Sequence, residues 1–218
     1  MIFNNNFEKI SESSYVWHNF LSTDISDEAF FESEALSKKP DKYVREIDGV
    51  ELLGGDMSQK IVDKVEDLFK DTNWEYKNLL HWYVPKDTWF AIHRDDEGRD
   101  TYPFKKVWSA VIYLSDMDGG ELFYPIENIT IKPIKGDLVI HKADCPHGAT
   151  PVTGDNKRTI TFTIYDKNHP IDPIDIPDPE QVRKLGWEQV CESTEWLNSP
   201  MGLRWRKQYN VPDDVLKI

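Results

Sequence analysis

Two histidines and one aspartate stand in an arrangement that suits a metal ion with open coordination positions. His93 and Asp95 form a His-x-Asp motif, and residues two apart in a strand point to the same face, so both side chains can approach one metal. His147 follows the dipeptide Cys145-Pro146 later in the chain, where a returning strand would bring it beside the first pair. Two imidazoles and one carboxylate on one side of a metal are typical of non-haem Fe(II) sites.

A second metal chemistry competes for the same region. His141, Cys145 and His147 lie close together in the sequence. A structural zinc ion is normally enclosed by four protein ligands, often including cysteine. The residues therefore leave two alternatives, an open iron site and a closed zinc cluster.

A cation that could bind an acidic molecule follows the last of these histidines. Arg158 stands at the start of a β-rich run. Its guanidinium can point into a barrel and bind a carboxylate through two parallel hydrogen bonds. The alternative is a surface arginine paired with one of the 39 acidic residues of the chain.

The elements that must position these residues are short strands in the middle of the chain. From 74 to 166, apolar and β-branched runs are broken by glycine and proline, a pattern typical of an all-β barrel or sandwich. In the last run, Ile160, Phe162 and Ile164 alternate with threonines, as a strand with one buried face requires. The predicted strands are Leu79–Val84, Trp89–His93, Val107–Leu114, Glu121–Tyr124, Ile129–Ile134, Leu138–His141 and Arg158–Tyr165.

Helices are expected on both sides of this β-rich region. Apolar residues recur at helical spacing over Ser58–Phe69, and a weaker pattern predicts a helix over Asp27–Ser37. After Asn168 the prolines cluster, which excludes helix and central strand, and Glu180–Leu197 again has a helical pattern that we expect to cover the sheet. We divide one domain, 1–218, into an N-terminal helical buttress (1–72), a β core (74–166) and a C-terminal extension (168–218).

Composition excludes several classes of function. The 218 residues, 39% of them apolar, suit one folded domain, and the formal net charge of −13 repels phosphate backbones, so nucleic-acid binding is disfavoured. No apolar run approaches the roughly 20 residues of a membrane helix, and the first residues do not resemble a signal peptide. Two cysteines suit a reducing compartment. We expect a cytoplasmic protein without membrane or nucleic-acid partners, and its oligomeric state stays open.

An ordered set of motifs runs from 80 to 165. It comprises Tyr83, His93-x-Asp95, Ile112-Tyr113-Leu114-Ser115-Asp116, Gly119-Gly120-Glu121-Leu122-Phe123, Pro133-x-x-Gly136-Asp137-Leu138, His147-Gly148-x-x-Pro151-Val152, Gly154 and Arg158. In order and spacing this set resembles the 2-oxoglutarate and Fe(II)-dependent dioxygenases, in particular their prolyl 4-hydroxylase-like branch. The likeness covers about 40% of the chain, because the two ends match no motif.

The resemblance implies a mostly β fold with flanking helices, a double-stranded β-helix of the jelly-roll or cupin-like type. It implies that His93, Asp95 and His147 bind Fe(II), that Arg158 and Tyr113 bind the distal carboxylate of 2-oxoglutarate, and that Tyr83 lies near this cosubstrate. The implied reaction consumes O2 and 2-oxoglutarate, hydroxylates a substrate and releases succinate and CO2. Ascorbate is an optional reductant in this scheme.

The natural substrate stays open. The implied target is a prolyl or similar residue in a protein or peptide; the alternatives are a free amino acid or small metabolite, or a non-enzymatic barrel that acts as a binding module. Two departures from proline-hydroxylating relatives weaken the first target: Ile164 where they commonly carry tryptophan, and Arg158 where collagen-type enzymes use lysine. The charged loop 94–100 is expected either to close over the substrate or to be a solvated turn.

Overall fold

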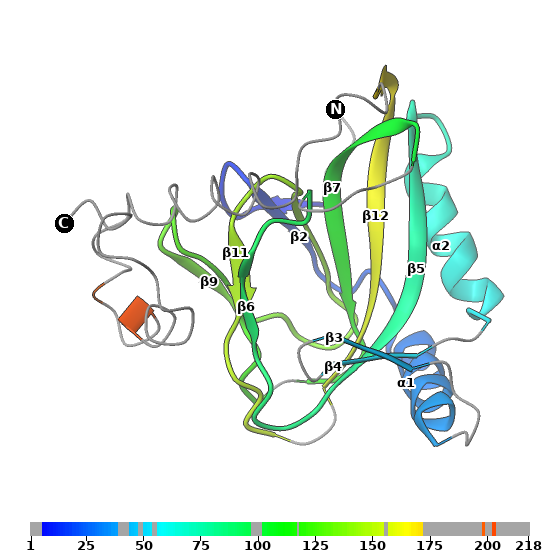
Figure 1. Cartoon of the computed structure of the whole chain (residues 1–218). Helices are drawn as coiled ribbons and strands as arrows, with labels where there is room; N and C mark the ends of the chain where they lie inside the picture. The colour runs from blue at the N-terminus through cyan, green and yellow to red at the C-terminus, as the bar shows by residue number, and fades with distance from the viewer. Residues whose placement is uncertain are drawn as a thin grey trace.

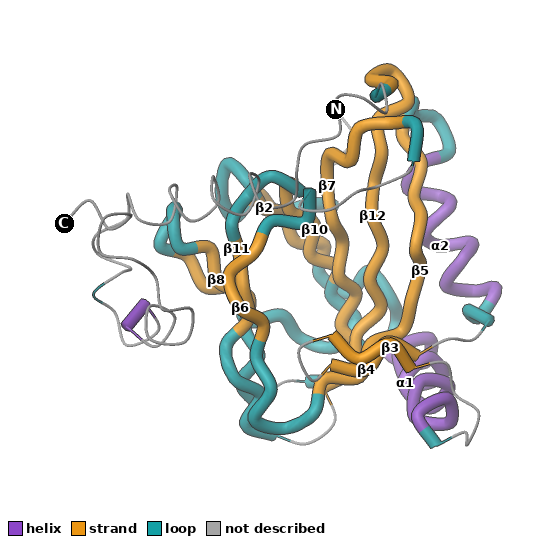
Figure 2. Tube along the Cα trace, viewed as in Figure 1, coloured by secondary structure: helices purple, strands orange, loops and turns teal. Residues whose placement is uncertain are grey.

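The computed structural model describes residues 6–38, 44–47, 50–53, 56–96, 102–116, 118–154, 157–171, 198 and 202–203. Their strands form two antiparallel sheets, one of eight strands and one of four, that lie face to face (Figure 1). The tube view shows long strands in the large sheet and short strands joined by loops in the small one (Figure 2). This pair of sheets is a double-stranded β-helix, the fold class that the sequence predicts.

The strand order fixes which segments become neighbours. The large sheet runs, in spatial order, β1 (Glu8–Lys9), β2 (Ser14–Trp17), β10 (Leu138–Lys142), β7 (Phe104–Tyr113), β12 (Lys157–Pro170), β5 (Trp74–Val84), β4 (Val50–Leu53) and β3 (Val44–Ile47). The small sheet runs β6 (Phe90–His93), β11 (His147–Ala149), β8 (Leu122–Tyr124) and β9 (Ile129–Ile131).

Two helices cover the outer face of the large sheet (Figure 1). Helix α2 (Gln59–Phe69) buries Ile61, Val65 and Phe69 at helical spacing, and α1 (Thr23–Ser37) buries Ala29 and Leu36. Apolar side chains from β12, β7 and β10 complete this core, namely Ile160, Phe162, Ile164, Ala110, Ile112, Leu138 and Ile140. Burial of this apolar face stabilises both helices against the sheet.

Strand β12 separates two environments, because successive side chains point to opposite faces. Ile160, Phe162 and Ile164 lie in the core beneath the helices. Lys157, Thr159 and the threonines after it face the space between the two sheets. The two faces of this strand therefore serve the core and a cavity respectively.

The sequence predicts the long elements and some of the short strands. The two helices predicted before the β core and all seven predicted strands are present, although α1 begins at Thr23 rather than Asp27 and β5 and β12 are longer than expected. The sequence does not predict β1, β2, β3, β4 or β11, although it does predict the equally short β6, β8 and β9. The N-terminal buttress is therefore partly β rather than helical.

Two predicted features lie outside the described residues, namely the helix over Glu180–Leu197 and most of the proline cluster. No helix in the described ranges is long and apolar enough to cross a membrane.

His81 on β5 makes the stability of this fold depend on pH. It is 1% exposed, and neither ring nitrogen has a hydrogen-bond partner among the described residues. Burial, and then the nearby Arg158 guanidinium, lower the pKa of His81 to about 4. The unfolded chain therefore binds a proton near pH 6.5 that the folded chain refuses, so stability is full above pH 6.5 and falls as the pH drops toward 4.

We expect His81→Leu to remove this part of the acid sensitivity. Between pH 7 and pH 5 the histidine should account for about 2 kcal/mol of lost unfolding free energy, measured by urea denaturation of both proteins at each pH. Equal losses in the parent and the variant would contradict this prediction.

Candidate active site

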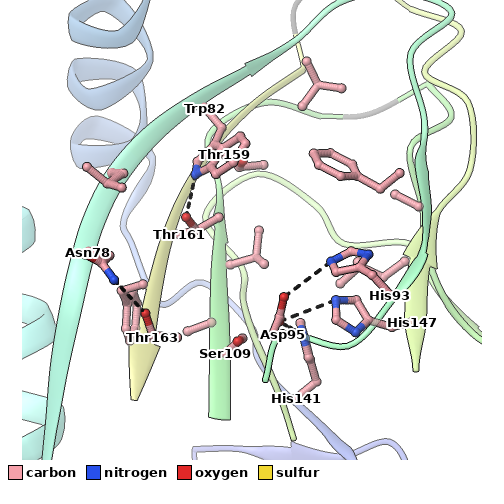
Figure 3. Close-up of a pocket in the computed structure, with 18 of the residues that line it drawn as sticks. Asn78, Trp82, His93, Asp95, Ser109, His141, His147, Thr159, Thr161 and Thr163 are labelled. Carbon is pink, nitrogen blue, oxygen red and sulfur yellow. Dashed lines mark hydrogen bonds and ion pairs between the residues drawn. The ribbon is translucent and has the colours of Figure 1, made fainter. Parts of the chain in front are cut away.

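A cavity of about 430 Å³ lies between the two sheets. The small-sheet side contributes His93, Asp95 and His147, and the large sheet contributes β12, β5 and β7 side chains. Figure 3 shows the imidazoles and the carboxylate turned toward one another on one wall of this cavity. The fold thus brings the three predicted metal ligands together.

Local strand pairing sets the geometry of this triad. His93 ends β6, His147 begins β11, and the two residues are direct partners in the antiparallel ladder, with ring centroids 4.5 Å apart. Asp95 follows in the turn after β6; its Oδ1 lies 3.4 Å from His93 Nε2 and its Oδ2 lies 3.6 Å from His147 Nε2. One ligand atom from each residue falls within 4.8 Å of the others, which is close enough to share one metal ion.

Hydrogen bonds fix which ring nitrogens face the centre. Nδ1 of His93 lies 2.8 Å from the carbonyl oxygen of Ala91, and Nδ1 of His147 lies 2.9 Å from that of Cys145. A carbonyl oxygen accepts, so each Nδ1 carries the proton and each Nε2 offers a lone pair. Burial, followed by the neighbouring His141, lowers the pKa of His147 well below its usual value. This ring is therefore neutral, as a metal ligand must be.

The carboxylate of Asp95 is held in its ionised form. Burial alone would raise its pKa, but His147, His141 and His93 outweigh burial and keep the pKa well below its usual range. The backbone is also fixed: the Asp95 amide donates to the Ala143 carbonyl at 2.9 Å, and Lys106 Nζ donates to the Asp95 carbonyl at 2.8 Å. Two neutral imidazoles and one fixed carboxylate fit Fe(II), and the cavity side stays open for other ligands.

The competing zinc cluster does not form. Cys145 packs among apolar residues, and its thiol donates to the Pro146 carbonyl at 3.7 Å. Within the described part of the chain, the ligand atoms that gather belong to His93, Asp95 and His147. His141 lies next to this group without being one of it.

The structure corrects the position expected for Arg158. Its Nη1 donates to Ser33 O at 2.9 Å and Ser33 Oγ at 3.0 Å, and its Nη2 donates to Ser37 Oγ at 3.1 Å. Both serines belong to α1, so the guanidinium joins β12 to a helix and points away from the cavity. Tyr83 is corrected with it, because its ring lies 4.6 Å from the Arg158 guanidinium carbon, on the same outer side.

Lys157 takes the cavity position that Arg158 does not. The residue is 5% exposed, and its Nζ donates to the Gly120 carbonyl at 2.8 Å. Burial lowers the pKa of Lys157 to about 8, while the charge of Glu121 acts in the opposite direction. No carboxylate forms an ion pair with this ammonium among the residues described, so it is a buried cation suited to an anionic ligand.

Tyr113 lies beside this cation. Its ring centroid is 5.8 Å from Lys157 Nζ, and its side chain lines the cavity. The Tyr113 hydroxyl is buried and has no hydrogen-bond partner within the described ranges. A phenol and an ammonium with unused donors can together bind one carboxylate.

The remaining wall carries neutral hydrogen-bonding groups. Thr161 Oγ1 accepts a bond of 2.6 Å from Trp82 Nε1, and Thr163 Oγ1 accepts one of 3.3 Å from Asn78 Nδ2 (Figure 3). The sequence analysis did not single out these threonines or Lys157. The alternation of side chains along β12 could have identified them, because Lys157, Thr161 and Thr163 point to the opposite face from its apolar residues.

Of the loop predicted over 94–100, residues 97–100 lie outside the described part of the chain.

Comparison with known proteins agrees with this geometry. Residues 79–165 match the model of the 2OG-Fe(II) oxygenase superfamily. A viral collagen prolyl hydroxylase from Paramecium bursaria Chlorella virus-1, solved with 2OG, superposes with a TM-score of 0.56 at 16% identity, over 71% of this chain and 96% of that chain. No curated protein matches the sequence.

Two further solved structures share the fold. A prolyl hydroxylase from Trichoplax adhaerens, in complex with a hypoxia inducible factor peptide fragment, gives a TM-score of 0.60 at 18% identity, over 72% of this chain and 86% of that chain. The epimerase SnoN, in complex with Fe3+, alpha ketoglutarate and nogalamycin RO, gives 0.56 at 14% identity, over 71% and 79%. At these identities the likeness establishes the double-stranded β-helix.

We expect His147→Ala to weaken divalent metal binding by about 100-fold or more, because it removes one of three ligands from a preformed site. Titration of the metal-free protein with Co(II) measures the effect. His169→Ala is a matched control, since this histidine is 67% exposed and hydrogen-bonds Asp166 at the far end of β12. Equal metal affinity in the two variants would place the metal elsewhere.

Proposed function

We propose that this chain, whose residues 79–165 match the 2OG-Fe(II) oxygenase superfamily, is a dioxygenase that holds Fe(II) through His93, Asp95 and His147 and takes 2-oxoglutarate as cosubstrate. Bound iron would supply the oxidation, in which one oxygen atom of O2 enters succinate and the other enters the substrate, with release of CO2. One observation carries the proposal: an open triad of ligands and a buried ammonium that has no ion-pair partner among the described residues line the same cavity.

Lys157 and Tyr113 would bind the distal carboxylate of 2-oxoglutarate. An ammonium inside a protein is costly unless an anion neutralises it, and the Gly120 carbonyl supplies only a partial charge to Lys157. A dicarboxylic ligand would satisfy Lys157 with one carboxylate and leave its 2-oxo acid end for the metal. Lysine in this position also removes one departure from the collagen-type enzymes, which use lysine as the anchor.

The proposed substrate is a prolyl or similar residue in a protein or peptide. Prolyl hydroxylases recur among the solved structures of the same fold. The second departure from proline-hydroxylating relatives, Ile164 in place of tryptophan, counts less against a prolyl substrate, because Ile164 lies in the core beneath the helices. Thr163 is the neighbouring residue that faces the cavity. Succinate release assayed with prolyl peptides, and separately with free amino acids, tests this choice.

A small-molecule substrate is the second candidate. The SnoN structure holds nogalamycin RO in the same fold, and the hydroxyl-bearing wall of Thr161 and Thr163 suits a polar compound. Succinate release stimulated by small molecules and not by peptides would favour this candidate. A metal-binding protein that releases no succinate with either class would favour the binding module.

Adjacent basic residues provide a sharp test of the carboxylate anchor. We expect Lys157→Met to weaken 2-oxoglutarate binding at least about tenfold, because it removes a charge-assisted hydrogen bond. Arg158→Met should leave this affinity unchanged and lower the unfolding free energy by roughly 1–3 kcal/mol, because its hydrogen bonds to α1 are lost. Calorimetric titration of the Mn(II)-loaded proteins, with urea denaturation alongside, measures both. If Arg158→Met weakened 2-oxoglutarate binding and Lys157→Met did not, Arg158 would be the anchor.

The affinity for 2-oxoglutarate should also depend on pH. Lys157 is protonated below its pKa of about 8, and an anion binds the protonated form. The dissociation constant should therefore rise by up to about tenfold per pH unit above pH 8. In Lys157→Arg the guanidinium stays charged, so the same titration should be flat. A parallel pH dependence in both proteins would assign it to another group.

A further inference from the structure

We propose that His141 is a positioning residue for the metal site, which holds one oxygen of Asp95 so that the other faces the metal. The inference rests on the proposed function, since it requires a metal at His93, Asp95 and His147. It goes further by assigning a role to a third histidine that is not among the three clustered ligands.

His141 lies against the triad from the large sheet. It belongs to β10, is 1% exposed, and its Nε2 lies 2.9 Å from Asp95 Oδ2. Its ring centroid is 4.0 Å from that of His147. Figure 3 shows His141 approaching Asp95 from the side away from His93. Oδ2 of the carboxylate therefore lies toward His141 and, at 3.6 Å, toward His147 Nε2, whereas Oδ1 lies toward His93.

The tautomer of His141 follows from its surroundings. Its Nδ1 is buried and has no hydrogen-bond partner among the described residues. A proton on Nδ1 would leave that N–H orphaned and set the Nε2 lone pair against a carboxylate oxygen. With the proton on Nε2, His141 instead donates a charge-assisted hydrogen bond to Asp95 Oδ2.

This bond restrains the Asp95 side chain, whereas the hydrogen bonds to Ala143 and Lys106 restrain only its backbone. His93 and His147 stand on paired strands, whereas Asp95 lies in a turn after β6. His141 stands on β10, which is hydrogen-bonded to β2 on one side and β7 on the other. The turn carboxylate is thereby attached to the interior of the large sheet. Partners of metal-ligating carboxylates that orient them commonly change metal affinity by 10–100-fold.

Metal affinity, measured without turnover, tests the inference. In titrations of the metal-free proteins with Co(II), His141→Leu should bind about 10–100-fold more weakly than the parent. His141→Gln should stay within about threefold of the parent, because its side-chain amide places an N–H near the position of Nε2. Parent-like affinity in the leucine variant, or equal weakening in both, would overturn the proposal. If the leucine variant does not fold, His141→Asn replaces it, since this amide is polar but too short to reach Oδ2.

A double-mutant cycle separates positioning from direct ligation. In the Asp95→Ala background, with Ni(II) as the probe because it binds nitrogen ligands more tightly than Fe(II), His141→Leu should have no further effect. A similar loss in both backgrounds would mean that His141 acts on the metal itself or through His147, and would overturn the proposal.

The two hypotheses fail in different ways. If the parent binds no metal that depends on His147, the proposed function fails and this inference fails with it. If the parent's affinity depends on His147 and Asp95 but not on His141, this inference alone fails.

Discussion

The alternation of apolar and polar side chains along β12 determines how the rest of the molecule is arranged. One face of the strand packs against the helices through Ile160, Phe162 and Ile164, and the other presents Lys157 and the threonines to the cavity. A shift of one residue would bury the threonines under α2 and expose the apolar side chains to the cavity. The hydrophobic core therefore sets the register that places the cation in the cavity. Stability and site geometry depend here on the same strand pairing.

Arg158 and Lys157 show how neighbouring cations come to differ. Arg158 is on the helix face, where serine oxygens of α1 accept its hydrogen bonds and two aromatic rings lie beside it. A guanidinium with five donors suits such a structural contact. Lys157 has one carbonyl partner on the opposite face, so its charge remains largely uncompensated. The first residue ties a helix to the sheet, and the second is available to a ligand.

Sequence reasoning predicts which side chains gather where the determinant is local. His93 and Asp95 share a short motif, and the return of His147 needs only a pair of adjacent strands. The position of the cavity cation Lys157 requires more, namely the knowledge of which face of β12 meets the helices. The alternation of Ile160 with Thr161 marks two faces, but it does not say that the apolar face belongs to the helices. Once α2 is recognised as the partner of that face, the phase of the strand excludes Arg158 from the cavity. The short strands β1 to β4 have no comparable signal.

The site also joins the two sheets, which makes its geometry a property of the whole barrel. His93 and His147 come from the small sheet, His141 and Lys157 from the large one, and Lys157 donates to Gly120 just before β8. Tyr113, Tyr124 and Leu122 pack in the cluster between the sheets and so fix how far apart the walls stand. Because well-packed interiors transmit strain, a volume change in that cluster would displace the ligands relative to the cation. The separation between the three clustered side chains and Lys157 therefore depends in part on Tyr124 and Leu122, which belong to neither group.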